Sequence, residues 1–134
     1  MSLAAADRRS IAVLVALLLL FGGGTQWWAA RRDDAIGHDL QRLAREGDIQ
    51  MLSSQTCGYC GEARSWLGSR GVRFEECFIE RDAACAQRWK ALAMPGTPVL
   101  LVKGQAQLGF DPERVLRVLD SGRSGGAVFG AMTH

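Results

Sequence analysis

The sequence predicts an α/β fold in which helices flank a mixed four-stranded sheet, preceded by one N-terminal transmembrane helix. Three observations lead to this prediction. A run of twenty residues without a charge begins at Ile11. From residue 49 to residue 120, short apolar runs typical of strands alternate with segments of helical periodicity. Finally, Lys103-Gly104-Gln105 is a hairpin signal, so the last two strands are antiparallel and the sheet is mixed.

The uncharged segment 11–30 has the length and the flanks of a membrane anchor. At a rise of ~1.5 Å per residue, it spans a hydrocarbon core of about 30 Å. Trp27 and Trp28 lie where an interfacial aromatic belt is expected. A cleaved signal peptide is the alternative, because the small residues Gly22–Gly24 tolerate cleavage, and a soluble helix is a third interpretation.

Charge predicts the orientation and the kind of partner. The tail 1–10 carries two arginines, which favours its retention in the cytoplasm, although Arg31 and Arg32 equal them in number on the other side. We therefore expect the rest of the chain on the periplasmic side of a bacterial inner membrane. The net charge is +2 and no block of one sign stands out, which argues against a nucleic-acid partner. We expect a monomer.

Residues 31–48 are expected to form an amphipathic linker helix, because Ile36, Leu40 and Leu43 recur at helical spacing before Gly47. A domain of about seventy residues, 49–120, follows. Its predicted elements are, in order, a strand at 49–53, a helix at 58–69, a strand at 72–79, a helix at 81–93, strands at 99–102 and 106–110, and a helix at 112–119. In the last of these, Asp111 is the expected N-cap and Pro112 the first helical residue. Residues 121–134 are expected to form a flexible tail.

The pair Cys57 and Cys60 carries the predicted chemistry. It directly follows a strand and opens a helix, so the first sulfur faces unpaired backbone N–H groups and the positive end of the helix dipole. Both effects favour the thiolate, which is the nucleophile in disulfide exchange. Cys60, nearly one turn later, is placed to displace a mixed disulfide from Cys57.

A second signal is Thr97-Pro98, which immediately precedes a buried strand. Proline donates no hydrogen bond to a sheet and is tolerated at the first position of a strand. A cis bond before Pro98 would turn the backbone of Thr97 towards the two cysteines.

Taken together, these motifs resemble the glutaredoxin-type members of the thioredoxin superfamily. The matching segments are "SSQTCGYCGEARSWL", "GVRFEECFIERDAACAQRWKAL", "PGTPVLLVKGQ" and "LGFDPERVLRVL". The resemblance implies a thioredoxin-like fold and thiol–disulfide exchange, with Cys57 as nucleophile and Cys60 as resolving thiol. It also implies that Thr97 and cis-Pro98 hold the substrate backbone. The other candidate substrate contacts are Thr56, Tyr59, Gly109, Phe110 and Asp111.

The chain also departs from the glutaredoxin pattern. Gly58-Tyr59 stands where glutaredoxins usually carry Pro-Tyr, Gln55 lies where they often have a lysine, and "FDPE" replaces an acidic pair. In that family, the lysine and the acidic pair contact glutathione. We therefore expect protein dithiols and disulfides as partners and no cofactor. A glutathione-dependent glutaredoxin is one alternative, and a non-enzymatic module that holds a metal or an Fe–S cluster through Cys57 is another.

Three interpretations are open for Cys77 and Cys85. They form a structural disulfide, which suits an oxidising compartment; or they are two buried free thiols; or they join Cys57 and Cys60 in a zinc site. The spacing argues against zinc, because the chain has no second Cys-x-x-Cys pair.

Overall fold

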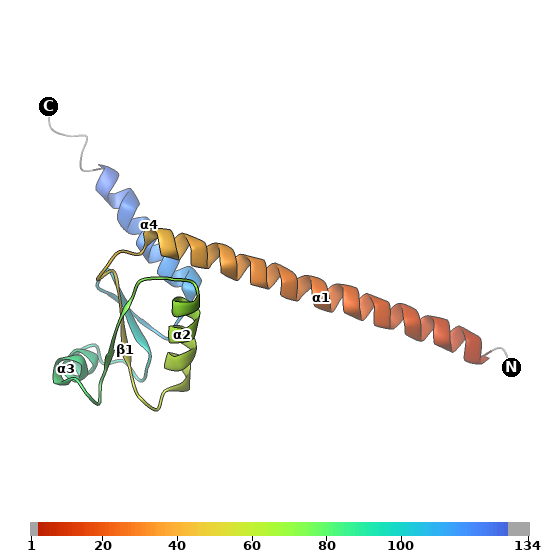
Figure 1. Ribbon diagram of the computed structural model, residues 1–134, viewed down its shortest axis with the longest axis horizontal. Coiled ribbons are helices and arrows are strands. Elements are labelled where there is room, and N and C mark those ends of the chain that lie inside the picture. Colours follow the sequence, from red (N-terminus) through yellow and green to blue (C-terminus); the bar gives the residue numbers. More distant parts are fainter. Residues whose placement is uncertain (1–2, 129–134) are drawn as a thin grey trace. The chain divides into compact units, whose positions relative to one another are not determined.

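The computed structural model describes residues 3–128 of the 134-residue chain (Figure 1). It divides into two compact units, one ending at Ala35 and the other beginning at Ile36. The long helix α1 (Leu3–Leu43) contributes to both.

The part of α1 within the first unit is apolar and exposed. The helical segment Asp7–Leu43 includes an 18-residue stretch with a mean hydropathy of 1.7, and among the described residues it is the one helix long and apolar enough to cross a membrane. The leucines at positions 18–20 expose most of their surface; Leu20, for example, is 72% exposed. Near the end of this unit, the Trp27 and Trp28 rings meet edge to face, and the Arg31 guanidinium lies 3.9 Å from the Trp27 ring centroid.

The last turns of α1 belong to the second unit and to its hydrophobic core. Ile36 and Leu40, four residues apart, are buried, whereas His38 is exposed. The structure differs from a separate linker helix at 31–48, because these residues continue α1 as far as Leu43. The helix ends at Leu43, and its apolar stripe packs in the core.

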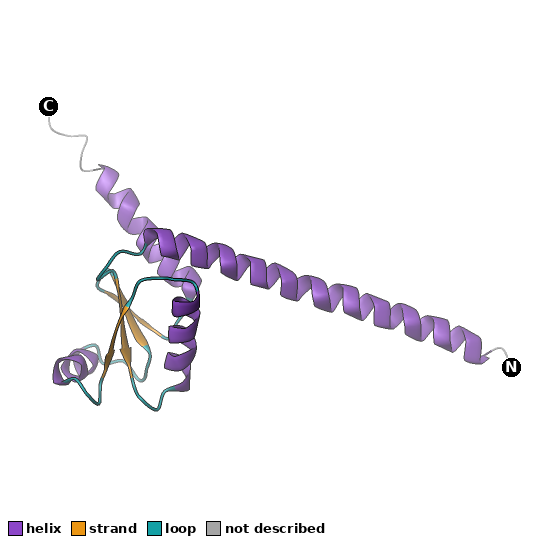
Figure 2. Cartoon of the chain, in the orientation of Figure 1, coloured by secondary structure: helices purple, strands orange, loops and turns teal. Residues whose placement is uncertain are grey.

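The second unit is built on a mixed four-stranded sheet (Figure 2). Its strands are β1 (Ile49–Ser53), β2 (Glu75–Phe78), β3 (Val99–Val102) and β4 (Gln105–Leu108), in the order β2-β1-β3-β4. β1 pairs with β2 in parallel, whereas β3 is antiparallel to both β1 and β4. The predicted mixed sheet and the hairpin at Lys103-Gly104 are confirmed.

Three helices, α2 (Gly58–Ser69), α3 (Ala83–Ala91) and α4 (Pro112–Val128), complete the fold. Figure 1 shows α2 and α3 on opposite sides of the sheet. The larger core cluster includes Leu40 of α1, Leu67 of α2 and Val115 of α4, packed with Met51 of the sheet. A smaller cluster on the α3 side contains Leu52, Cys85 and Val99.

Two predicted elements have different bounds in the structure. β2 covers only 75–78 of the predicted 72–79, because Val72 is buried in the turn after α2, where its N–H donates to the Leu67 carbonyl. α4 continues to Val128, so the prediction of a flexible tail is wrong for residues 121–128. This segment is rich in glycine but has no proline to remove a backbone donor, so the helical ladder continues. The rest of the predicted tail, 129–134, lies outside the described residues.

Candidate active site

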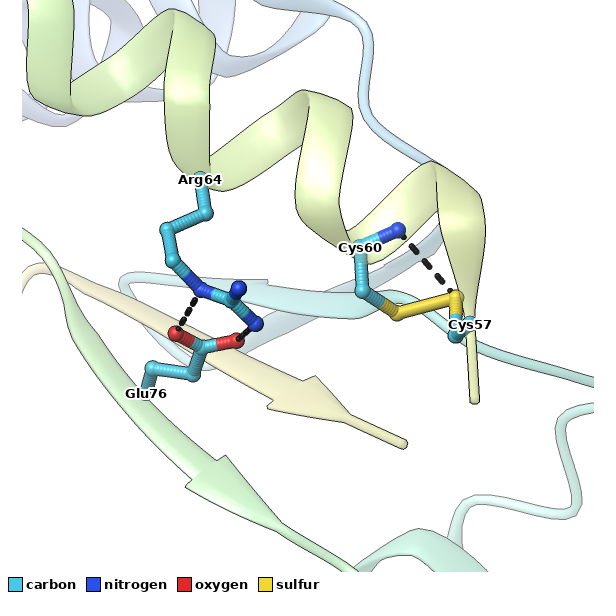
Figure 3. Close-up of polar contacts among 4 residues, drawn as sticks. All are labelled: Cys57, Cys60, Arg64 and Glu76. Carbon is cyan, nitrogen blue, oxygen red and sulfur yellow. Dashed lines mark hydrogen bonds and ion pairs between the residues drawn. A yellow bond between two sulfur atoms is a disulfide. The ribbon is translucent and has the colours of Figure 1, made fainter. Parts of the chain in front are cut away.

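Cys57 and Cys60 form a disulfide at the start of α2 (Figure 3). Cys57 is the N-cap residue, with extended backbone angles, and its Sγ accepts a hydrogen bond from the Cys60 N–H at 3.1 Å. The sulfur thus takes the place that a serine or aspartate oxygen has in an ordinary N-cap. Cys60 is fully buried, whereas Cys57 is half-buried. When the bridge is reduced, the same N–H favours a thiolate at Cys57, and the more accessible of the two sulfurs is also the better stabilised one.

The peptide bond between Thr97 and Pro98 is cis, and it brings the chain before β3 against the cysteine pair. The Cys57 Sγ lies 3.4 Å from the Thr97 carbonyl oxygen. The expectation that the Thr97 backbone faces the dithiol is therefore confirmed. Pro98 itself is buried, and its carbonyl accepts a hydrogen bond from Gly109 N–H at 2.8 Å. This bond ties the segment after β4 to the cis-proline segment.

The other candidate substrate contacts fall into two groups. Tyr59 is 74% exposed beside the disulfide, and Thr56 is also exposed. Phe110 and Asp111, by contrast, have partners within the domain. The Phe110 ring packs on Trp66 with the centroids 5.3 Å apart, and Asp111 Oδ1 caps α4 by accepting from the N–H groups of Glu113 and Arg114. Substrate contact by any of these residues stays a prediction.

An ion pair that sequence reasoning missed lies next to the cysteines. Arg64, one helical turn after Cys60, donates two hydrogen bonds to Glu76 of β2, at 2.6 and 2.7 Å (Figure 3). Burial alone raises the pKa of Glu76, but the hydrogen bonds and the positive charge of Arg64 outweigh it, so the pKa lies below its ordinary value. This pair fastens α2 to β2 close to Cys60. The signal in the sequence was a glutamate at an inward position of a strand.

The second cysteine pair forms a separate disulfide, which joins β2 to α3. Cys77 and Cys85 have their Cα atoms 6.1 Å apart, and Cys85 is 3% exposed. They lie on the α3 side of the sheet, opposite α2 and the first pair. The four cysteines therefore do not meet, which rules against a shared zinc site. Within residues 3–128, no three metal-ligating side chains gather in one place.

A parallel β1–β2 pair, an antiparallel hairpin, flanking helices and a Cys-x-x-Cys pair facing a cis-proline define a thioredoxin-like fold of the thiol oxidoreductase type. Residues 49–106 match the family model for glutaredoxin. This part of the chain, which is fewer than half of its residues, is therefore similar to glutaredoxins.

Solved structures of similar proteins are distant in sequence. The thioredoxin-like protein BC3987 is 24% identical over 52% of this chain and 97% of its own, with a TM-score of 0.46. The glutaredoxin from Archaeoglobus fulgidus is 19% identical over 54% of this chain and 85% of its own, with a TM-score of 0.44. The holo form of glutaredoxin C1 from Populus tremula x tremuloides is 20% identical over 67% of this chain and 97% of its own, with a TM-score of 0.46. Among curated proteins, no sequence matches this chain significantly.

Proposed function

We propose that this protein is a thiol–disulfide oxidoreductase that exchanges disulfides with protein substrates through Cys57 and Cys60. The observation that carries the proposal is the position of the Cys57 sulfur. It lies at the N-cap of α2, accepts the Cys60 N–H and adjoins the Thr97 carbonyl. An inert structural bridge needs none of these contacts, whereas a nucleophilic sulfur needs a stabilised thiolate and an adjacent backbone that orients the substrate.

In the reducing direction, the Cys57 thiolate attacks one sulfur of a substrate disulfide and expels the other as a thiolate. The product is a mixed disulfide between Cys57 and the substrate. Cys60, after losing its proton to solvent or to the expelled thiolate, attacks the Cys57 sulfur and releases the second substrate thiolate. The Cys57–Cys60 bridge is then closed, and two electrons have passed to the substrate. The oxidising direction is the reverse of these steps.

The proposal is tested by reducing insulin with the full-length chain and a dithiol donor, and by titrating the reduction potential of the Cys57–Cys60 pair. We expect catalysed insulin reduction and a potential within the range of known exchange proteins, about −270 to −120 mV. No rate above that of the dithiol alone, together with a potential below about −300 mV as in structural disulfides, would contradict it.

The substrate is proposed to be a protein and not glutathione. We expect a substrate strand to bind to the backbone of Thr97, which lies beside Cys57, through hydrogen bonds that any extended peptide can make. Glutathione instead needs cations for its carboxylates. Gln55 stands in the turn before Cys57, where glutaredoxins often have a lysine, so this position offers no cation to a glutathione carboxylate. Glu80, an anion, contacts the same turn, and the Arg81 guanidinium is engaged by the Gln55 amide. No cofactor is proposed.

We therefore expect slow glutathione-dependent reduction of hydroxyethyl disulfide, at least tenfold slower than in an otherwise identical Gln55→Lys variant. A hydrogen bond between charged groups contributes about 1.5–3 kcal/mol, and each 1.4 kcal/mol corresponds to about tenfold in affinity. Insulin reduction is the control, and it is expected to differ less than threefold between the two proteins. Efficient turnover of the small disulfide by the unsubstituted chain would contradict the proposal and show that the protein is a glutathione-dependent enzyme.

We further propose that α1 anchors the domain to a membrane, with the domain on the periplasmic side of a bacterial inner membrane. The support is the exposed apolar surface of α1 in the first unit and the Trp27–Trp28–Arg31 cluster after it. A chain that begins at Ile36 retains the whole second unit and serves as the control.

The full chain is expected to sediment with membranes and to stay there after a carbonate wash, whereas the chain from Ile36 is expected in the soluble fraction. In intact spheroplasts, added protease is expected to digest the domain. Release of a shortened soluble product that begins near Thr25 or later would show a cleaved signal peptide. A full-length chain in the wash supernatant would contradict membrane insertion of either kind.

A further inference from the structure

The turn that leads into Cys57 is held by a carboxylate from another part of the chain. The Ser54 hydroxyl donates a hydrogen bond to Glu80, and the Gln55 N–H donates to both carboxylate oxygens of Glu80, at 3.3 and 3.2 Å. The hydrogen bond from Ser54 is the main reason why the pKa of Glu80 lies below its ordinary value, so the acceptor is ionised at neutral pH. Glu80 thus orders two successive residues of the turn.

The same turn fixes the backbone of the cysteine. The Cys57 N–H donates to the Ser54 carbonyl at 3.2 Å, and the Cys57 Sγ then accepts from the first turn of α2. A displacement of Ser54 therefore moves the N-cap residue and weakens the contact between its sulfur and the Cys60 N–H. The hydrogen bonds of Glu80 go to Ser54 and Gln55, so a positioning effect on Cys57 would run through these two residues.

The segment that carries Glu80 is closed by the second disulfide. Residues 79–82 connect β2 to α3, and the Cys77–Cys85 bridge links the strand before this loop to the helix after it. Within it, the Asp82 N–H donates to the Phe78 carbonyl, and Asp82 Oδ1 caps α3 by accepting from Ala84 N–H and Cys85 N–H. Because β1 and β2 are parallel, this loop and the turn at 54–56 leave the sheet at the same end (Figure 2).

We propose that Glu80 is a positioning residue for Cys57 and that the Cys77–Cys85 disulfide holds Glu80 in place. The inference rests on the proposed exchange activity of Cys57. The second disulfide thus acts on the active site through a hydrogen-bonded carboxylate, not by exchange between sulfurs, since the two bridges lie on opposite sides of the sheet.

The test compares Glu80→Ala with Glu80→Gln in the full-length chain. The Cys57–Cys60 bridge is opened with limiting dithiol, and the rate of Cys57 alkylation by iodoacetamide is followed from pH 4 to pH 9 by peptide mapping, which also verifies that Cys77–Cys85 stays closed. In Glu80→Ala we expect a thiolate pKa above that of the unsubstituted chain and a roughly three- to tenfold slower reaction at pH 6. Glu80→Gln keeps an acceptor oxygen and is expected to restore the rate to within about twofold.

A purely electrostatic role gives the opposite pattern, because loss of a nearby negative charge lowers the pKa of a thiol. In that case Glu80→Ala and Glu80→Gln accelerate alkylation at pH 6 equally, and the positioning role is overturned. Glu62→Ala, which removes an exposed carboxylate of α2, is the control for charge alone. Rates in Glu80→Ala that equal those of the unsubstituted chain also overturn the inference.

The link to the second disulfide is tested with the double variant Cys77→Ala/Cys85→Ala. We expect the same slowing of Cys57 alkylation as in Glu80→Ala. When the three substitutions are combined we expect little further slowing, because the double-cysteine variant and Glu80→Ala remove the same constraint on the turn before Cys57. Additive effects would overturn the link. If the double-cysteine variant does not fold, the two Glu80 variants still decide the positioning role. Should Cys57 of the unsubstituted chain react no faster than an exposed free cysteine, the proposed activity itself fails.

Discussion

Substitution of Cys57 by serine is expected to abolish disulfide exchange, whereas substitution of Cys60 by serine is expected to stop the reaction at the mixed disulfide. Cys57 carries the more accessible sulfur and receives the N–H of Cys60, so it is the group that attacks. A serine at position 57 is not a nucleophile towards disulfides at neutral pH. With Cys60→Ser, the mixed disulfide forms but the buried second thiol that would release it is missing.

The measurement is insulin reduction together with non-reducing electrophoresis of cell extracts. Cys57→Ser is expected to give background rates and no adducts, and Cys60→Ser to give adducts that disappear on addition of dithiol. The double variant Cys57→Ser/Cys60→Ser, in which adducts through the second disulfide would persist, is the control. If Cys60 proves to be the sulfur that is alkylated first at pH 6, the two roles are assigned the wrong way round.

Loss of the Cys77–Cys85 disulfide is expected to lower the free energy of unfolding of the domain by about 2–3 kcal/mol, the value for closing a loop of this length. The bridge joins an edge strand to α3, whose only buried residue is Cys85, so few other contacts replace it. Equilibrium unfolding in urea of the full chain in detergent is the measurement, with Cys77→Ala/Cys85→Ala compared against the unsubstituted protein.

Strongly reducing buffer provides the control for this comparison. Under these conditions both proteins lack the bridge. The difference in their free energies of unfolding is then expected to shrink to the contribution from the packing of the two sulfur atoms. Equal stability of the two proteins under oxidising conditions would show that the bridge does not stabilise the domain, and would favour an interpretation of these cysteines as dispensable for folding.

Several elements follow from the sequence by itself. The bounds of β1, α2 and β3 agree with those expected from the apolar runs and from the turn and capping residues around them. The cysteine pair at the start of α2 was also predictable. In these cases the information is local, because hydrophobic periodicity and a capping position act over a few residues. The cis bond at Thr97-Pro98 was implied by the resemblance to glutaredoxins and not by the residues alone.

Tertiary structure alone decided the rest. The sequence left three interpretations open for Cys77 and Cys85. In the structure, the parallel register sets Cys77 beside Leu52, and α3 packs on the same side of the sheet. This arrangement brings Cys77 and Cys85 together as a disulfide. The contact of Glu80 with Ser54 joins residues 26 positions apart. Such pairings depend on which strands are neighbours and on which side of the sheet each helix packs. A local pattern carries no record of either, because the same alternation of apolar residues fits several strand orders.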